Sequence, residues 1–329
     1  MDKKILNKYP DINLIKETSK SISNRVVSTP VLELTGSKIS TLLPKNASVR
    51  MKMELFQHTG SFKSRGVLIA FDKLNNKQKK NGVVAFSAGN HALAVSWGSK
   101  ACGVNAKVVM LKTSDPSRIQ GCKDYGAEVI LCENIKEAFA VMNEIAISEN
   151  RTILHPFDSE NMILGSASCG LEIIENFPEI EVAIVPIGGG GLISGISAAL
   201  KQIKPSILIY GVEPEGADTM YQSFKNDCPV KLDKVQTIAD SLGPPMAMEY
   251  SFRIAQEFVD AVVRVKDDDL IKALKIMRDN LNLIVEPACG ASLAGLLGPL
   301  KEMVAGKAVS IIACGSNISF ERYKNLIHD

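Results

Sequence analysis

AIVPIGGGGLISGISAALKQIKPSILIYGVE, residues 183–213, is the stretch that decides the fold. An apolar run over 183–187 leads into four consecutive glycines at 188–191. Apolar residues at helical spacing follow as far as Leu200, and then a second β-branched run covers 207–213. Strand, turn, helix and strand in this order are typical of a right-handed crossover between parallel strands.

The same alternation continues over most of the chain. The apolar runs are mostly continuous rather than alternating, as expected for strands that are covered on both faces. Further strands are predicted at 49–55, 83–86, 106–111, 128–131 and 309–313. The sequence therefore predicts an α/β fold with a mainly parallel sheet, in which ligands bind on the loops that follow the carboxyl ends of strands.

No linker rich in Pro, Gly or Ser divides the 329 residues, although a chain of this length favours two domains. We therefore expect a discontinuous arrangement. A small domain at 53–151 is inserted into a large domain formed by 1–52 plus 152–329.

The composition is that of an ordinary globular protein, with 46% hydrophobic and 22% charged residues. Lys and Arg number 38 against 36 Asp and Glu, a balance that predicts neither a nucleic-acid nor a membrane partner. Seven cysteines without a C-x-x-C pair, and a segment 1–10 without an apolar run, predict a cytoplasmic protein.

The segment HTGSFKSRG, residues 58–66, carries a candidate functional lysine. Ser61 is predicted to be the N-cap of a helix, which places Lys63 in the first turn. A charged lysine is unfavourable there because the helix dipole is positive at that end, whereas a neutral nucleophile with a lowered pKa is suited to it. The alternative is a solvent-exposed lysine, which this segment alone favours.

Two further loops follow predicted strands. In FSAGNH, residues 86–91, small side chains leave backbone N–H groups free for an anion, and a capping turn built on Ser87 or Asn90 is an equal alternative. In ACGSN, residues 313–317, Cys314 could bond weakly to a ring nitrogen. A small buried residue at a strand end is the stronger interpretation of Cys314 alone.

The four glycines at 188–191 favour a phosphate-binding turn at the start of a helix. A dinucleotide fingerprint is the alternative, because Glu213 lies about twenty residues further on. Its spacing fails, since the third glycine would fall at Ile193 or Ser194. The four histidines also lack metal-ligand spacing.

Together and in this order, these segments resemble the serine/threonine dehydratase and serine racemase family of fold-type II pyridoxal-phosphate (PLP) enzymes. Similar stretches are HPFD (155–158), GVEP (211–214), TIAD (237–240) and VEP (285–287). The resemblance implies a tryptophan synthase β-like fold, with two open, twisted, mainly parallel sheets flanked by helices. It also implies PLP as cofactor and a homodimer.

The resemblance further implies roles for single residues. Lys63 is similar to the catalytic lysine that forms a Schiff base with the cofactor, and Glu286 to a residue beneath the cofactor ring. The other residues that match cofactor-binding positions are Phe62, Asn90, Gly188, Gly189, Gly190, Gly191 and Cys314. Those that match positions around the substrate are Ser87, Ala88, Asn90 and His91.

Three positions depart from the family's pattern. Serine racemases carry a second serine, an acid/base on the ring face away from the lysine, where this chain has Ala88. The family's divalent-metal site uses Glu213, the Ala217 carbonyl and an acid where Thr219 stands, so no metal is predicted. Ser241 replaces a glycine that many relatives place near the substrate.

The expected activity is that of an ammonia-lyase: elimination of water from L-threonine, L-serine or a similar β-hydroxy amino acid, giving a 2-oxo acid and ammonia. The sequence leaves the preferred amino acid open. Racemisation and β-replacement on the same scaffold are the alternatives within this class. An NAD-dependent oxidoreductase and a non-catalytic PLP carrier are the alternatives outside it.

Overall fold

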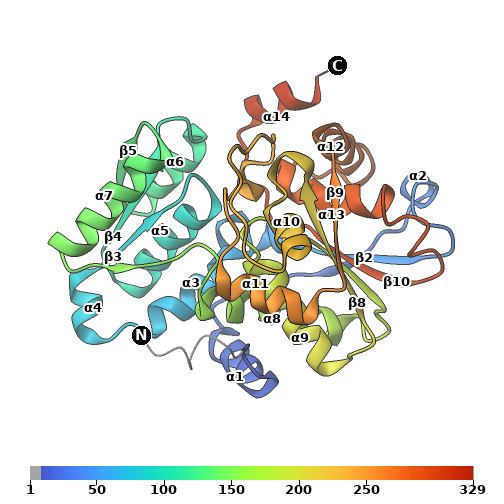
Figure 1. Cartoon of the computed structure of the whole chain (residues 1–329), viewed down its shortest axis with the longest axis horizontal. Helices are drawn as coiled ribbons and strands as arrows, with labels where there is room; N and C mark the ends of the chain where they lie inside the picture. Colours follow the sequence, from blue (N-terminus) through green and yellow to red (C-terminus); the bar gives the residue numbers. More distant parts are fainter. Residues whose placement is uncertain (1–8, 329) are drawn as a thin grey trace.

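The computed structural model describes residues 9–328 and shows an α/β fold with two separate sheets (Figure 1). The segment 1–10, used above to predict the cellular compartment, therefore lies almost entirely outside the described residues. The strands are β1 Val31–Glu33, β2 Ser48–Lys52, β3 Val83–Phe86, β4 Ala106–Leu111, β5 Glu128–Cys132, β6 Thr152–Ile153, β7 Val182–Pro186, β8 Leu208–Pro214, β9 Ala261–Val265 and β10 Ala308–Ile312.

The larger sheet has six strands in the order β1-β2-β10-β7-β8-β9, and the smaller has four in the order β5-β4-β3-β6. All neighbouring strands are parallel except β1, which runs antiparallel to β2 at one edge. The predicted α/β fold with two mainly parallel sheets is confirmed.

Helices cover both sheets, as the continuous apolar strands require. We call each sheet with the helices that cover it the larger part and the smaller part of the molecule. In the larger part, α13 packs against β7 to β10, and α8 packs along α9. In the smaller part, α5 and α7 pack against β3 and β4. The helices are α1 Ile12–Ile22, α2 Ser37–Ser40, α3 Lys63–Asp72, α4 Asn76–Asn81, α5 Asn90–Cys102, α6 Pro116–Asp124, α7 Ile135–Ser148, α8 Glu160–Asn176, α9 Gly191–Ile203, α10 Thr219–Asn226, α11 Glu249–Phe258, α12 Asp267–Leu281, α13 Pro287–Leu297 and α14 Phe320–Ile327.

The domain boundaries stay a prediction, but β6 bears on one of them. Thr152 and Ile153 pair with β3 in the four-stranded sheet, although the predicted small domain ends at 151. Helix α3 packs on α8 in the larger part and on α5 in the smaller part, so it contacts both.

The parallel arrangement determines where a ligand site can form. The loops after β3, β7 and β10 all leave the carboxyl ends of strands, where open α/β sheets bind ligands. Within residues 9–328, we find no helix both long enough and apolar enough to cross a membrane.

Candidate active site

A cavity of about 490 Å³ collects the loops that the sequence singled out. Its walls come from the loops after β3, β7 and β10, from the start of α3 and from the segment before α8. All the predicted site residues line it, namely Phe62, Lys63, Ser87, Ala88, Asn90, His91, Gly188, Gly189, Gly190, Gly191 and Cys314. Segments far apart in the chain thus meet in one site.

Backbone pairing joins the lysine loop to the cysteine loop. Ser61 and Gly315 form an antiparallel bridge, and the Phe62 N–H donates to the Cys314 carbonyl at 3.3 Å. Lys63 begins α3, so its predicted place in the first helical turn is confirmed. The predicted N-cap is wrong: Ser61 is extended because it pairs with Gly315, Phe62 holds the cap position, and the Ser61 hydroxyl is buried without a protein partner in the described chain.

The Lys63 amine is poised to lose its proton. Burial in the cavity lowers its pKa to about 8, although the nearby Cys314 and Glu286 raise it. The amine donates a hydrogen bond to the Pro156 carbonyl and lies 4.9 Å from the centre of the Phe62 ring. A lysine with this pKa is partly neutral near pH 8 and can act as a nucleophile or base.

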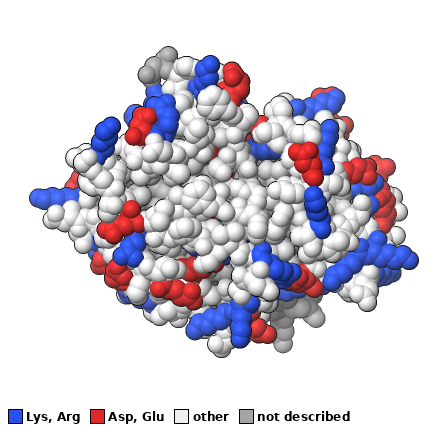
Figure 2. Space-filling model, turned by 180° about the vertical axis from the view of Figure 1, so that it is seen from behind, with Lys and Arg blue, Asp and Glu red and all other residues white. Residues whose placement is uncertain are grey.

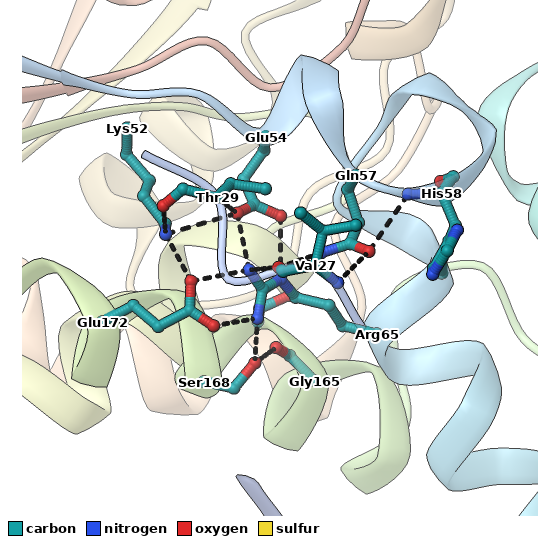
Figure 3. Close-up of polar contacts among 12 residues, drawn as sticks. Val27, Thr29, Lys52, Glu54, Gln57, His58, Arg65, Gly165, Ser168 and Glu172 are labelled. Atoms are coloured by element: carbon teal, nitrogen blue, oxygen red, sulfur yellow. Dashed lines mark hydrogen bonds and ion pairs between the residues drawn. The ribbon is translucent and has the colours of Figure 1, made fainter. Parts of the chain in front are cut away.

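A buried charge cluster holds the first turn of α3 in place (Figure 3). Arg65, two residues after Lys63, bonds Glu54 through Nε at 2.8 Å and Glu172 through Nη1 at 2.7 Å. Lys52 also pairs with Glu172, so two cations face two carboxylates. Sequence reasoning missed this cluster because its members lie on β2, η1 (Glu54–Phe56), α3 and α8.

The four glycines form a cradle at the start of α9. Within the described chain, the N–H groups of Gly188, Gly189 and Gly190 donate to no protein acceptor. Gly190 caps the helix with a φ of 89°, and a Cβ atom on Gly189 would lie 2.2 Å from the Phe157 ring. Free N–H groups at a helix N-terminus suit a phosphate, and this spacing leaves no room for side chains.

The loop after β3 is not a side-chain capping turn, because Gly89 is the N-cap of α5. The Ser87 hydroxyl instead accepts a hydrogen bond from the Gly89 N–H at 3.2 Å. His91 contacts the Leu154 carbonyl through Nε2 at 2.9 Å, and its Nδ1 has no protein partner in the described residues. Burial lowers the pKa of His91 to about 3, so the ring is neutral at physiological pH.

Asn90 links this loop to the opposite wall of the cavity. Its amide nitrogen donates to Glu286 Oε1 at 2.6 Å, and its carbonyl oxygen accepts from Asn317 at 2.7 Å. One hydrogen of the amide is left for a ligand. A Cβ atom on Gly315 would lie 2.3 Å from Glu286 Oε1, so a side chain at this position would displace the carboxylate that Asn90 bonds.

Arg118 on α6 is a cavity residue that the sequence did not indicate. It bonds Asp240 Oδ2 and Glu286 Oε2, both at 2.9 Å, and the Asn317 carbonyl at 2.8 Å. Burial raises the pKa of Glu286, while Arg118 opposes this rise. No local signal identifies Arg118, because its partners are distant in the chain.

Cys314 is a neutral thiol. A hydrogen bond with Cys289, and then burial, raise the pKa of Cys314 well above its ordinary value. The residue is 4% exposed at the end of β10. It can therefore offer only a weak, uncharged contact to a ligand.

The position considered for a metal is taken up by protein hydrogen bonds. Glu213 accepts from the N–H groups of Met220 at 2.9 Å and Tyr221 at 2.7 Å, and burial raises its pKa to about 8. Among residues 9–328, no group of three or more His, Cys, Asp or Glu side chains could hold a metal ion. That no metal binds stays a prediction.

Comparison with known proteins agrees with this fold and site. The chain belongs to the pyridoxal-phosphate dependent enzyme family, whose model matches residues 22–315, and PLP is therefore its cofactor. Over 308 residues the chain is 42% identical to a phenylserine dehydratase of Ralstonia pickettii, covering 94% of this chain and 93% of the relative.

Serine racemases are also similar to this chain. The serine racemase of Schizosaccharomyces pombe is 35% identical over 327 residues and 99% of both chains. The structure of maize serine racemase superposes with a TM-score of 0.90 at 33% identity, covering 97% of this chain and 98% of that one. The fold-type II assignment made from the sequence is thus confirmed.

The residues present fit the cofactor. A lysine with a lowered pKa, a cradle of free N–H groups and a neutral thiol line one cavity. These groups match an aldehyde, a phosphate and a pyridine nitrogen, which PLP carries together.

Proposed function

We propose that this enzyme eliminates water from a β-hydroxy α-amino acid, giving a 2-oxo acid and ammonia, with Lys63 as the catalytic residue. One observation supports this most strongly: the Lys63 amine, with a pKa of about 8, shares a cavity with the tetraglycine loop and the Ser87 loop. The relatives are named for different amino acids, and their names therefore do not determine which β-substituent the substrate of this enzyme carries.

Each residue has a task in this proposal. The N–H groups of 188–191 would hold the cofactor phosphate, Phe62 would pack on its ring, and Cys314 would offer its thiol to the ring nitrogen. Asn90 would donate its remaining amide hydrogen to the cofactor's 3′-oxygen. The loop of Ser87, Ala88, Asn90 and His91 binds the substrate carboxylate with backbone N–H groups.

Lys63 moves the proton at Cα. When bound, PLP supplies an electron sink that acidifies the Cα–H bond. The neutral Lys63 amine accepts this proton, and the β-hydroxyl takes up one proton as it leaves as water, which balances the proton lost from Cα. The resulting enamine tautomerises and is hydrolysed to the 2-oxo acid and ammonia.

Elimination is favoured over racemisation because of Ala88. A racemase needs a group that returns a proton from the face opposite the lysine, and the methyl side chain of Ala88 carries no such proton. Ala88 lines the cavity in the Ser87 loop.

Absorbance and product analysis test the proposal together. The purified protein should show the visible absorption of bound PLP and release 2-oxo acid from L-threonine, L-serine or 3-phenylserine. Lys63→Ala should abolish both, whereas Lys77→Ala, an exposed lysine on α4, should keep both. A Lys63→Ala enzyme with full activity would disprove the assignment.

We also propose a cytoplasmic homodimer. Seven free cysteines suit a reducing compartment. The face in Figure 2 has a broad central area without Lys, Arg, Asp or Glu, as homodimer interfaces often have. Analytical ultracentrifugation should give twice the 35.6 kDa chain mass, and a monomer would contradict the assembly.

A further inference from the structure

One side of the active-site cavity is apolar. It consists of six side chains from the smaller sheet and α7, which we call the apolar wall: Phe86, Leu111, Ile135, Phe139, Met142 and Ile153. Ile135, Phe139 and Ile153 are 44%, 46% and 41% exposed, high values for large apolar residues that line an active site. Exposed apolar surface inside a concave site indicates a ligand group that covers it.

The apolar wall adjoins the loop that binds the substrate carboxylate in the proposed function. Phe86 ends β3 and is covalently joined to Ser87. The Phe86 and Phe139 rings meet edge to face, with centroids 4.9 Å apart and planes at 67°. A substrate whose carboxylate lies at Ser87 can therefore place its β-substituent against two aromatic rings.

Among residues 9–328, the lining of the cavity offers no free cation for an acidic β-substituent. The cationic side chains of this described lining are Lys63, which carries the cofactor in the proposed function, and Arg118. Each nitrogen of the Arg118 guanidinium already bonds Asp240, Glu286 or Asn317. Burial lowers the pKa of both His91 and His155, so these rings stay neutral.

We propose that the apolar wall binds an aromatic β-substituent, so that the substrate is a 3-aryl-3-hydroxy amino acid such as 3-phenylserine. This rests on the dehydration proposed above. An aryl ring gains edge-to-face contacts with Phe86 and Phe139 in addition to apolar burial. The methyl group of threonine is too small to cover the wall, and the carboxylate of 3-hydroxyaspartate would be buried without a partner. Phe139 is the specificity-determining residue, because its half-exposed ring faces the ligand space.

Substrate competition gives the first test. We expect kcat/KM for L-threo-3-phenylserine to exceed that for L-threonine by roughly tenfold or more, in line with the discrimination that apolar pockets achieve. The value for 3-hydroxyaspartate should be lower still. Equal or better use of L-threonine would overturn the aryl assignment and leave the dehydration intact.

Variants of α7 give the second test. Phe139→Ala should lower kcat/KM for phenylserine by about tenfold and change that for threonine less than about twofold. Ile147→Ala is the matched control, since Ile147 lies on the same helix, is 79% exposed and is outside the cavity. Phe139→Arg should shift preference toward 3-hydroxyaspartate, because it adds a free cation. An equal loss for all substrates in Phe139→Ala would mean that Phe139 only supports the fold, and would overturn the assignment.

A ligand that cannot lose water separates binding from chemistry. L-Phenylalanine lacks the β-hydroxyl, so its binding can be followed through the visible band of the bound cofactor without 2-oxo acid release. It should bind more tightly than L-alanine and L-aspartate, and Phe139→Ala should remove this preference. If phenylalanine binds selectively but no β-hydroxy amino acid is dehydrated, the proposed reaction fails and the aryl site stands. If phenylalanine shows no preference, the aryl site fails.

Discussion

In the proposed reaction, the side chain at position 88 determines whether a proton can return to the substrate on the face opposite Lys63. Ala88 lines the cavity, and its methyl group can neither donate nor accept a proton. Ala88→Ser introduces a hydroxyl there, and a positioned acid/base contributes on the order of 10²–10⁴-fold to proton transfer. We expect the ratio of D-isomer to 2-oxo acid to rise by at least about tenfold, measured by chiral chromatography with L-serine. An unchanged ratio would show that residue 88 does not face Cα.

Lys63 gives the site a defined pH dependence. The neutral amine is the reactive form, and burial lowers its pKa to about 8. The rate at which the apoenzyme takes up PLP should therefore rise about tenfold per pH unit below this pKa and level off above it. Stopped-flow absorbance between pH 6 and pH 10 measures the rate. A rate that climbs without a break to pH 10 would indicate an ordinary lysine pKa.

At the scale of helices and strands, α3 carries Lys63, and the charge cluster of Figure 3 anchors it. Arg65→Met leaves Glu54 and Glu172 without their main cation, and breaking a buried ion pair costs about 3–5 kcal/mol. We expect a loss of that size in the free energy of unfolding by urea at pH 7. Arg25→Met is the control: Arg25 pairs with Asp72 at the other end of α3, both are more than a third exposed, and the loss should stay below about 1 kcal/mol.

The pH dependence of this effect has a definite sign. Burial raises the pKa of Glu54, but Arg65 and then Lys52 and Thr29 outweigh it, so the pKa in the folded protein is lowered. A lowered carboxylate pKa contributes stability above the unfolded value of about 4.3, and this is lost as the pH falls through the folded value. The difference in the free energy of unfolding between the wild type and Arg65→Met should therefore become smaller as the pH falls below about 4. If this difference became larger in acid, the ion pair between Arg65 and ionised Glu54 would not be its cause.

The strands that the sequence predicted well are those covered on both faces. The predicted 83–86 and 106–111 coincide with β3 and β4 in the middle of the smaller sheet. β1, β6 and β9 were missed because many of their residues are partly or fully exposed, so these strands lack a continuous apolar run. The predicted 49–55 ends early at Lys52, since Glu54–Phe56 turns into a short 3₁₀ helix.

The site was predictable to the extent that it consists of loops after strands. Lys63, Asn90, Gly188 and Cys314 belong to short motifs whose residue types already suit a cofactor. Arg118 was not predicted as a site residue, because its partners Asp240 and Glu286 lie 122 and 168 positions away in the sequence. Such partners become visible only when the two sheets are placed together.

For the molecule as a whole, Arg118 is one of the links between the elements of the smaller sheet and those of the larger sheet. It extends from α6, beside the smaller sheet, to Asp240, Glu286 and Asn317, which follow strands of the larger sheet. Figure 1 shows the two sheets side by side, with α6 at the top of the smaller part. Glu286 also bonds Asn90, so Arg118 is connected through Glu286 to the candidate cofactor site.

Removal of the Arg118 side chain should make the smaller part less rigid and leave Glu286 without a cation. We expect Arg118→Met to lower the free energy of unfolding by about 3–5 kcal/mol, as for other buried pairs that lose one member. Hydrogen exchange should also become faster in α5 and α6, and the affinity for PLP should fall. Arg322→Met is a matched control, since Arg322 bonds the same Asp240 oxygen at 2.9 Å but is 35% exposed. An exposed pair contributes less than about 1 kcal/mol, so equal effects of the two variants would show that Asp240, and not the link through Arg118 between the two sheets, determines the stability.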